Sequence, residues 1–329
     1  MYNLIKSPFR VSLFGGGSDY PDYYNKEPGS VLGFAINKYI YISCLTYQNF
    51  ENKKKYLISY AKTEYENHLK NIQHKVIKEV FRYYNVNFPL HLSIQSEIPA
   101  QTGLGSSSVF TVSILNLMHA MKKKRPKKIE LAKKAIYFEQ KILKENVGSQ
   151  DQCHSAFGGF NLIKFHKNII KVKSILNYKD QYKELFDSMY LIFSNKTRSA
   201  YKIVESQIIN TKKGKLNESI KEGQYILEDA LKVFRKKNKN YVYEISELLN
   251  HSWEIKKTFS KVITNIEIDN MYQKMLDCGG IGGKLCGAGQ SGFLLAIVPK
   301  ENLDKFMKKM KKYKMFKVGL DYDGSKILV

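Results

Sequence analysis

The sequence is poor in cysteine, proline and tryptophan, and it has no long hydrophobic run. Its 329 residues include four cysteines, seven prolines and one tryptophan. The cysteines show no CxxC spacing, so neither a disulfide framework nor a cysteine metal site is expected, which fits a reducing cytoplasm. No apolar run approaches the ~20 residues of a membrane span, and Met1–Arg10 lacks the apolar core of a signal peptide. With 43% hydrophobic and 26% charged residues, disordered and collagen-like classes are excluded.

Acidic residues and arginine are also scarce. Lys and Arg total 54 against 30 Asp and Glu, which gives a formal net charge of +24, yet only five of the basic residues are arginine. Nucleic-acid and phosphate recognition favours the bidentate fork of arginine. We therefore expect most of the lysine excess to be solvated surface, with a nucleic-acid-binding protein kept as an alternative.

The length and the pattern of elements indicate two domains, 1–180 and 181–329, because single cores stop growing at roughly 250–300 residues. Strands are expected over 9–14, 31–45, 90–95, 160–165, 189–193 and 293–298. Helices are expected over 65–84, 106–121, 129–146, 199–210, 217–236, 241–259, 268–278 and 301–313. Strands and helices in both halves favour an α+β fold with a cleft between the domains.

Three glycine-rich segments stand out, of which the one at Gly103–Ser108 is the most informative. Two glycines and three serines open directly into an apolar helix, so backbone N–H groups and the positive end of the helix converge, as phosphate binding requires. The alternative is a serine N-cap after a plain turn. A Walker A loop fails at Cys278 and Leu285. The GxGxxG at Gly287–Gly292 runs into a strand, unlike a dinucleotide-binding fingerprint.

Three acidic residues occupy positions that suggest chemistry. Glu139 falls on the apolar face of the helix expected over 129–146, where a carboxylate is costly unless it is paired or metal-bound. Asp151 and His154 lie in a polar stretch that reads as a loop and could supply a general base. Asp19 could hydrogen-bond a polyol. The alternatives are structural: Glu139 could lie at the edge of the apolar stripe, Asp151 could stand at a helix N-terminus, and Asp19 could close a turn.

Taken together, three segments resemble the motifs of the GHMP kinase superfamily, which includes galactokinase, homoserine kinase and mevalonate kinase. They are Ser7–Tyr20, Pro99–Ser108 and Lys284–Gly292, in the family's order and spread over nearly the whole chain. Within the superfamily, Gly15–Pro21, Val31–Tyr39 and Gly148–Gln152 look closest to sugar kinases. They are most similar to D-glycero-D-manno-heptose 7-phosphate kinases, and fucose kinases share much of the pattern.

The resemblance implies an N-terminal domain like ribosomal protein S5 domain 2, a C-terminal ferredoxin-like domain, and ATP and Mg²⁺ bound at the cleft between them. Its implied catalytic residues are Asp151 and Arg10, and its Mg²⁺ ligands are Ser107 and Glu139. The implied ATP-binding residues are Gly103, Leu104, Gly105, Ser106, Ser107, Ser108, Gly287 and Gly289. The implied sugar contacts are Gly16, Gly17, Asp19, His154 and Arg198.

The implied reaction is phosphorylation of the anomeric hydroxyl of D-glycero-D-manno-heptose 7-phosphate to the 1,7-bisphosphate. The alternative within the family is a fucose-type kinase acting on an unphosphorylated sugar. A cationic pocket for the distal phosphate separates the two, with Arg198, His154 or Lys38 as candidates. The expected partners are ATP and a small sugar phosphate, with no nucleic acid and no membrane, and a homodimer is compatible with the sequence.

Overall fold

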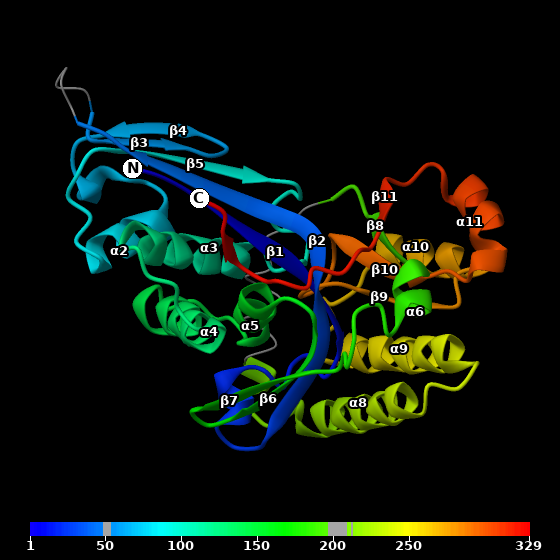
Figure 1. The fold of residues 1–329 in the computed structure, drawn as a ribbon. Helices are drawn as coiled ribbons and strands as arrows, with labels where there is room; N and C mark the ends of the chain where they lie inside the picture. The colour runs from blue at the N-terminus through cyan, green and yellow to red at the C-terminus, as the bar shows by residue number, and fades with distance from the viewer. Residues whose placement is uncertain (49–53, 197–208, 212) are drawn as a thin grey trace.

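The computed structural model describes residues 1–48, 54–196, 209–211 and 213–329, which form two lobes, each built on its own sheet (Figure 1). Within these residues the sheets have eight and four strands. The mixture of sheets and helices agrees with the predicted α+β class.

The sheet of the first lobe is assembled around β2 (Gly29–Thr46), which pairs antiparallel with β1, β5 and β6 along different parts of its length. The strand order is β12-β1-β2-β5-β3-β4, with β6 on β2 and β7 on β6. The other strands are β1 (Tyr2–Phe14), β3 (Tyr56–Ser59), β4 (Thr63–Glu66), β5 (Leu90–Ser96), β6 (Phe160–His166), β7 (Ile169–Ser174) and β12 (Lys326–Ile327).

The central helix of this lobe is α3 (Ser106–Met121), whose side chains are almost all buried from Ser108 onward. A helix that is apolar on all sides must be covered on all sides, and α3 packs against β1, α4 and α5. The remaining helical segments are α1 (Pro21–Tyr24), η1 (Leu69–Asn71), α2 (Lys75–Tyr83), α4 (Lys128–Tyr137), the π-helical turn η2 (Phe138–Ile142) and α5 (Gln150–Phe157).

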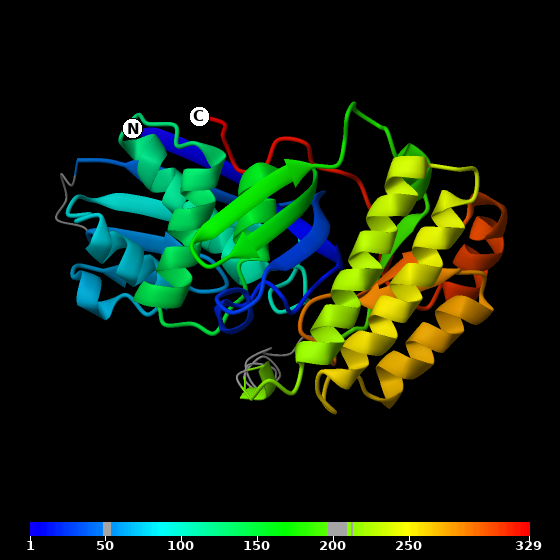
Figure 2. The same ribbon diagram turned by 90° about the horizontal axis from the view of Figure 1, so that it is seen from below.

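The second lobe has an antiparallel sheet in the order β11-β8-β10-β9. Three helices, α8, α9 and α10, lie side by side in this lobe (Figure 2). Of these, α9 and α10 pack against β9, whereas α8 packs against α9 and against β1 and β2 of the first sheet. Its strands are β8 (Met189–Phe193), β9 (Gly282–Leu285), β10 (Phe293–Ile297) and β11 (Met315–Lys317). Its helices are α6 (Lys183–Asp187), α8 (Asn217–Lys236), α9 (Tyr241–Thr258), α10 (Ile266–Asp277), η3 (Lys300–Asn302) and α11 (Leu303–Met310).

The chain passes between the lobes twice. It leaves the first sheet after β7, which ends at Ser174, and enters the second at β8, which begins at Met189. After β11 it returns, and β12 pairs antiparallel with β1 through Ile5 and Ile327. The second lobe is therefore inserted between two strands of the first sheet. In the described part of the chain, no helix combines the length and apolarity that crossing a membrane requires.

Several predicted elements coincide with the structure and others are wrong. The strand over 189–193 and the helix over 217–236 are confirmed at both ends. The helix predicted over 65–84 is wrong in its first half, which contains β4 and η1. The helix predicted over 129–146 leaves α-geometry at Phe138 and ends at Ile142. The prediction over 199–210 falls almost entirely outside the described residues.

Candidate active site

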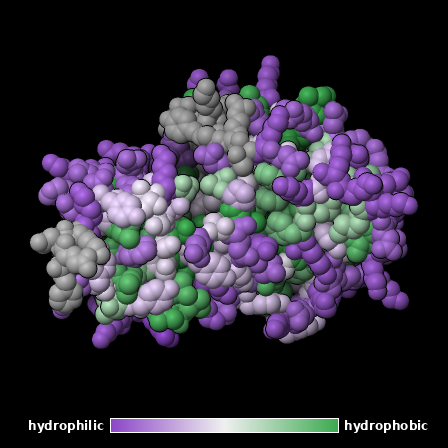
Figure 3. Space-filling view, turned by 90° about the horizontal axis from the view of Figure 1, so that it is seen from above, coloured by the Kyte–Doolittle hydropathy of each residue, from purple (hydrophilic) through white to green (hydrophobic). Residues whose placement is uncertain are grey.

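A cavity of about 790 Å³ is lined by all three glycine-rich segments and by both lobes. Its size is typical of a small-molecule site. The first lobe contributes the end of β1, the loop into α3 and the start of α5, and the second contributes α9 and the loop after β9. Figure 3, which views the molecule from above, shows hydrophilic side chains spread over both lobes rather than gathered in one patch.

The loop before α3 has the geometry of an anion-binding turn. Gly103 and Gly105 have φ values of +83° and +81°, which glycine adopts readily, and Gly105 is the N-cap of α3. Ser106 and Ser107, at the start of the helix, line the cavity. The free N–H groups and positive end of α3 thus face the cavity. Leu104 differs from its neighbours, because its side chain is fully buried and it is not among the residues that line the cavity.

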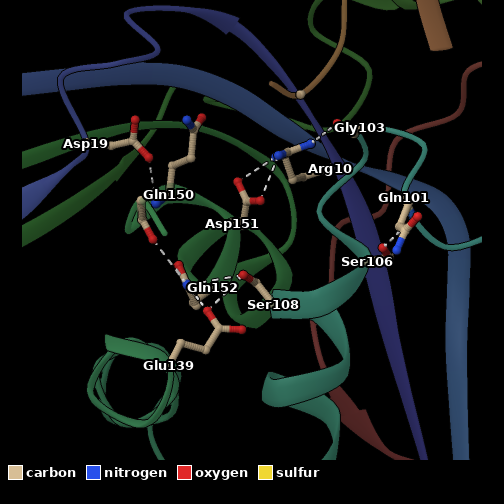
Figure 4. Close-up of polar contacts among 12 residues, drawn as sticks. Arg10, Asp19, Gln101, Gly103, Ser106, Ser108, Glu139, Gln150, Asp151 and Gln152 are labelled. Atoms are coloured by element: carbon tan, nitrogen blue, oxygen red, sulfur yellow. Dashed lines mark hydrogen bonds and ion pairs between the residues drawn. The ribbon is translucent and has the colours of Figure 1, made fainter. Parts of the chain in front are cut away.

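Arg10 and Asp151 form a bidentate ion pair beside this loop (Figure 4). The Nε and Nη2 atoms of Arg10 each donate to a carboxylate oxygen of Asp151 at 2.7 Å, and Nη1 donates to the carbonyl of Gly103 at 2.6 Å. Burial disfavours the charged guanidinium, but Asp151 outweighs this effect and the pKa of Arg10 is raised. A Cβ on Gly105 would lie 2.9 Å from Oδ2 of Asp151. The pair therefore sits directly against the loop before α3, residues 103–105, which we call the phosphate-type loop.

Asp151 lies in the first turn of α5, so its prediction as a loop residue is wrong. Most of the buried side chains of α5 are polar, so the spacing of apolar residues does not predict this helix. The first turn of α5 also helps to hold Asp19, because the N–H group of Gln150 donates to its carboxylate at 3.3 Å. The N–H group of Gly17 donates to the same carboxylate at 3.2 Å. Burial, and then the charge of Asp151, raises the pKa of Asp19. Gly16, Gly17 and Asp19 all line the cavity, as their predicted role requires.

Glu139 is fully buried one layer behind the loop, on the π-helical turn η2. Its Oε2 accepts hydrogen bonds from Ser108 Oγ at 2.9 Å and from Gln152 Nε2 (Figure 4), whereas no hydrogen bond reaches Oε1 within the described residues. Burial raises the pKa of Glu139 to about 7. A buried carboxylate with an unpartnered oxygen suits a cation, so the donor set fits Mg²⁺, which Glu139 and Ser107 would hold. The direct contact to Glu139 comes from Ser108 rather than from Ser107.

The prediction of His154 as a substrate contact is wrong. Its side chain is fully buried on the inner face of α5, where a Cβ on Gly33 would meet its Nε2 at 2.8 Å. Burial, and then the charge of Arg10, lowers its pKa to about 3. Lys38 instead forms an ion pair with Glu97 at 3.2 Å, outside the cavity lining. Arg198 lies outside the described residues.

Two lysines of the second lobe line the cavity and were not predicted as site residues. Lys256 is on α9, and Lys284 is on β9, within the third glycine-rich motif. Lys284 had a sequence signal, because it opens that motif. Lys256 had none, since a lysine on an amphipathic helix ordinarily marks the solvated face.

Comparison with known proteins identifies the family of this arrangement. The family model of the GHMP kinases N terminal domain matches residues 71–159. The D-glycero-alpha-D-manno-heptose 7-phosphate kinase of Campylobacter jejuni is 30% identical over 94% of this chain and 94% of its own length. A galactokinase of Thermosipho africanus is 25% identical over 92% and 91%. The solved mevalonate kinase of Methanococcus jannaschii has a TM-score of 0.72 at 22% identity, covering 96% of this chain and 98% of that one.

Proposed function

Because this chain belongs to the GHMP kinases, and is therefore an ATP- and Mg²⁺-dependent phosphotransferase acting on a hydroxyl group, we propose that it phosphorylates the anomeric hydroxyl of D-glycero-D-manno-heptose 7-phosphate. The product is the 1,7-bisphosphate, an intermediate suited to nucleotide activation of the heptose. The name of the relative in Campylobacter jejuni supports this substrate.

One observation carries the proposal: the Arg10–Asp151 pair is fixed against the loop that precedes α3. The pair spans two elements far apart in sequence, and a third contact, from Arg10 to the Gly103 carbonyl, ties it to the loop. Phosphoryl transfer depends mainly on positioning and on electrostatic stabilisation. A carboxylate and a guanidinium held beside an anion-binding helix end supply both, together with a group that can accept a proton.

The mechanism follows from these positions. Backbone N–H groups at the start of α3 hold the triphosphate, with its terminal phosphate toward Asp151. Asp151 orients the anomeric hydroxyl and accepts its proton, and Arg10 stabilises charge on the transferring group. Asp19 accepts a hydrogen bond from a second sugar hydroxyl. Glu139 and Ser107 would hold Mg²⁺, which would supply positive charge to the phosphate oxygens.

A coupled ADP-release assay over a panel of sugars and sugar phosphates tests this function. We expect kcat/KM for heptose 7-phosphate to exceed that for the same heptose without the phosphate, and for fucose and galactose, by at least about 10²-fold. Equal or greater turnover of an unphosphorylated sugar would assign the chain to the galactokinase-like alternative, which the similarity to galactokinases makes the next candidate.

A further inference from the structure

The wall of the cleft that belongs to the second lobe presents two lysine ammonium groups, of which Lys284 is buried and Lys256 is partly buried. Lys256 Nζ donates to the carbonyls of Leu285 (3.2 Å) and Gly287, and Lys284 Nζ donates to the carbonyl of Leu13 at 2.7 Å. Both side chains line the cavity that holds Asp151. They are therefore anchored through backbone carbonyls at the edges of the third and first glycine-rich segments.

The charge of these lysines is not matched by the protein. Within the described residues neither ammonium forms an ion pair with a carboxylate, and the charges that act on Lys256 are those of Lys284 and Arg10 besides the Cys286 thiol. Two carboxylates of the cavity are otherwise engaged, Asp151 by Arg10 and Asp19 by backbone N–H groups. Burial and the neighbouring cations lower the pKa of Lys256 to about 7 and that of Lys284 to about 8.

Withdrawing two lysine ammonium groups from water without a counter-charge is costly unless a ligand supplies the anion. The position of the lysines indicates which anion. The segment that Lys256 holds packs onto the phosphate-type loop so tightly that a Cβ on Gly103 would lie 2.4 Å from the carbonyl oxygen of Cys286. Lys256 is thus placed next to the layer where the triphosphate and the acceptor sugar meet.

We propose that Lys256 and Lys284, with Arg10, form a phosphate-binding cluster, and that Lys256 directly contacts a phosphate of the bound substrates. The inference rests on the proposed function, because it gives that substrate's phosphate a place in the cleft. The same chemistry would recognise the terminal phosphate of ATP or the distal phosphate of the sugar. The charges of Lys256 and Lys284, which no carboxylate of the described residues pairs with, suit a phosphate dianion better than a single carboxylate.

The test compares Lys256→Met, which removes both charge and donor, with Lys256→Gln, which removes the charge and keeps an N–H donor for the carbonyls of Leu285 and Gly287. The matched control is Lys257→Met, because Lys257 is the next residue on α9, does not line the cavity, and forms an ion pair with Glu254 at 2.6 Å. Lys284→Met tests the second ammonium and replaces any Lys256 variant whose melting temperature falls. Each protein is titrated with inorganic phosphate and with ATP–Mg²⁺, and KM is measured for ATP, heptose 7-phosphate and the unphosphorylated heptose.

We expect both Lys256 variants to weaken at least one phosphate ligand by about 30-fold or more, as truncating one partner of a buried charge pair does, with the control unchanged. A loss confined to heptose 7-phosphate assigns the distal phosphate, and a loss for ATP assigns the transferred one. Wild-type values in both variants, or rescue of the Met defect by Gln, would overturn the proposal and leave Lys256 as a support for the glycine-rich loop. If the wild type does not prefer heptose 7-phosphate, the proposed function fails, yet the ATP and inorganic phosphate titrations still decide the cluster.

Discussion

At the level of single residues, the site is defined by a few buried charges and by the groups that hold them. Arg10, Asp19 and Asp151 line the first-lobe side of one cavity, and Glu139 lies behind it in contact with Ser108. Asp151 contributes most directly to the proposed reaction, because it is the carboxylate fixed between the guanidinium and the phosphate-type loop.

Replacing Asp151 by Asn removes the proton acceptor while keeping the size of the side chain. We expect kcat to fall by about 10²–10⁴-fold, the usual contribution of a positioned acid–base group, with the Kd for ATP nearly unchanged. Initial rates and nucleotide titration measure the two effects. Asp229→Asn, in an exposed ion pair with Lys232, is the control for loss of a carboxylate. Near-normal turnover of Asp151→Asn would remove Asp151 from the catalytic role.

His154 gives a prediction about stability and pH. The unfolded chain binds a proton near pH 6.5, whereas burial holds the folded pKa at about 3, so stability is lost as the pH falls below 6.5. The loss for this group is at most about 1.4 kcal/mol per pH unit. His154→Leu removes two ring nitrogens that have no hydrogen-bond partner in the described structure. Urea denaturation should therefore show a flatter acid limb, with KM for the sugar unchanged. An unaltered acid limb would contradict the buried neutral imidazole.

At the level of elements, the loop before α3 and the first turn of α5 depend on each other's position. Gly105 is the point of contact, since its left-handed backbone starts α3 and its missing side chain leaves room for the carboxylate of Asp151. The two elements can approach this closely because no Cβ separates them.

Gly105→Ala should disturb the site more than it disturbs the fold. The new Cβ would lie 2.9 Å from Oδ2 of Asp151, in a left-handed backbone conformation that costs alanine about 1–2 kcal/mol. We expect kcat to fall at least about tenfold, since small displacements of a catalytic group are expensive. Gly214→Ala is the matched control, because Gly214 also has a positive φ of +71°, and its added Cβ meets Asn217 at an ordinary 3.5 Å. An equal loss of kcat in both variants would contradict the argument.

The elements also show how much of the fold and site the sequence predicts. Periodicity and motif order predicted α8, β8, the α+β class and several of the residues that line the cleft, among them Arg10 and Asp151. The failure over 65–84 has a specific cause. The buried carboxylate of Glu64 accepts the backbone N–H groups of Gln73 (2.7 Å) and His74 (3.2 Å), so the helix begins only at Lys75. Such a long-range capture of the backbone leaves no trace in hydrophobic spacing.

The same limit applies to the site residues. His154 looked functional because a polar residue stands near Asp151 in sequence, but one face of α5 points into the core and the other into the cleft. Lys256 was missed for the opposite reason. Its side chain looks like one on a solvated helix face, and it faces a cavity only because the two lobes meet there. In each case the sequence supplies the chemistry of the residue, and the tertiary structure decides whether that chemistry meets a ligand.

At the level of the whole molecule, the segment that returns from the second lobe before β12 is hydrogen-bonded to the first lobe. Ser325 Oγ accepts hydrogen bonds from Ser7 Oγ at 2.7 Å and from Asn116 Nδ2 at 2.9 Å, which ties the segment both to β1 and to α3. Asp321 Oδ1 accepts the N–H groups of Asp323 and Gly324 nearby and fixes the turn that precedes it.

Ser325→Ala removes one partner from each of two part-buried hydrogen bonds. We expect a destabilisation of about 1–3 kcal/mol, because the side chains of Ser7 and Asn116 lose their partner. The midpoint of urea denaturation measures it, with KM for ATP serving as a check that the cleft is intact. A midpoint equal to that of the wild type would mean that the segment is held by the backbone pairing of β12 alone.

The insertion of the second lobe between β7 and β12 has a consequence for biosynthesis. Ile5 and Ile327 are paired across about 320 residues of chain. The strand β1 is therefore synthesised long before β12, the strand that pairs with its outer edge. The N-terminal lobe, although synthesised first, cannot be completed first. Its unsatisfied edge stays open until the second lobe has emerged, so during synthesis this edge is where nascent chains would need a chaperone's protection.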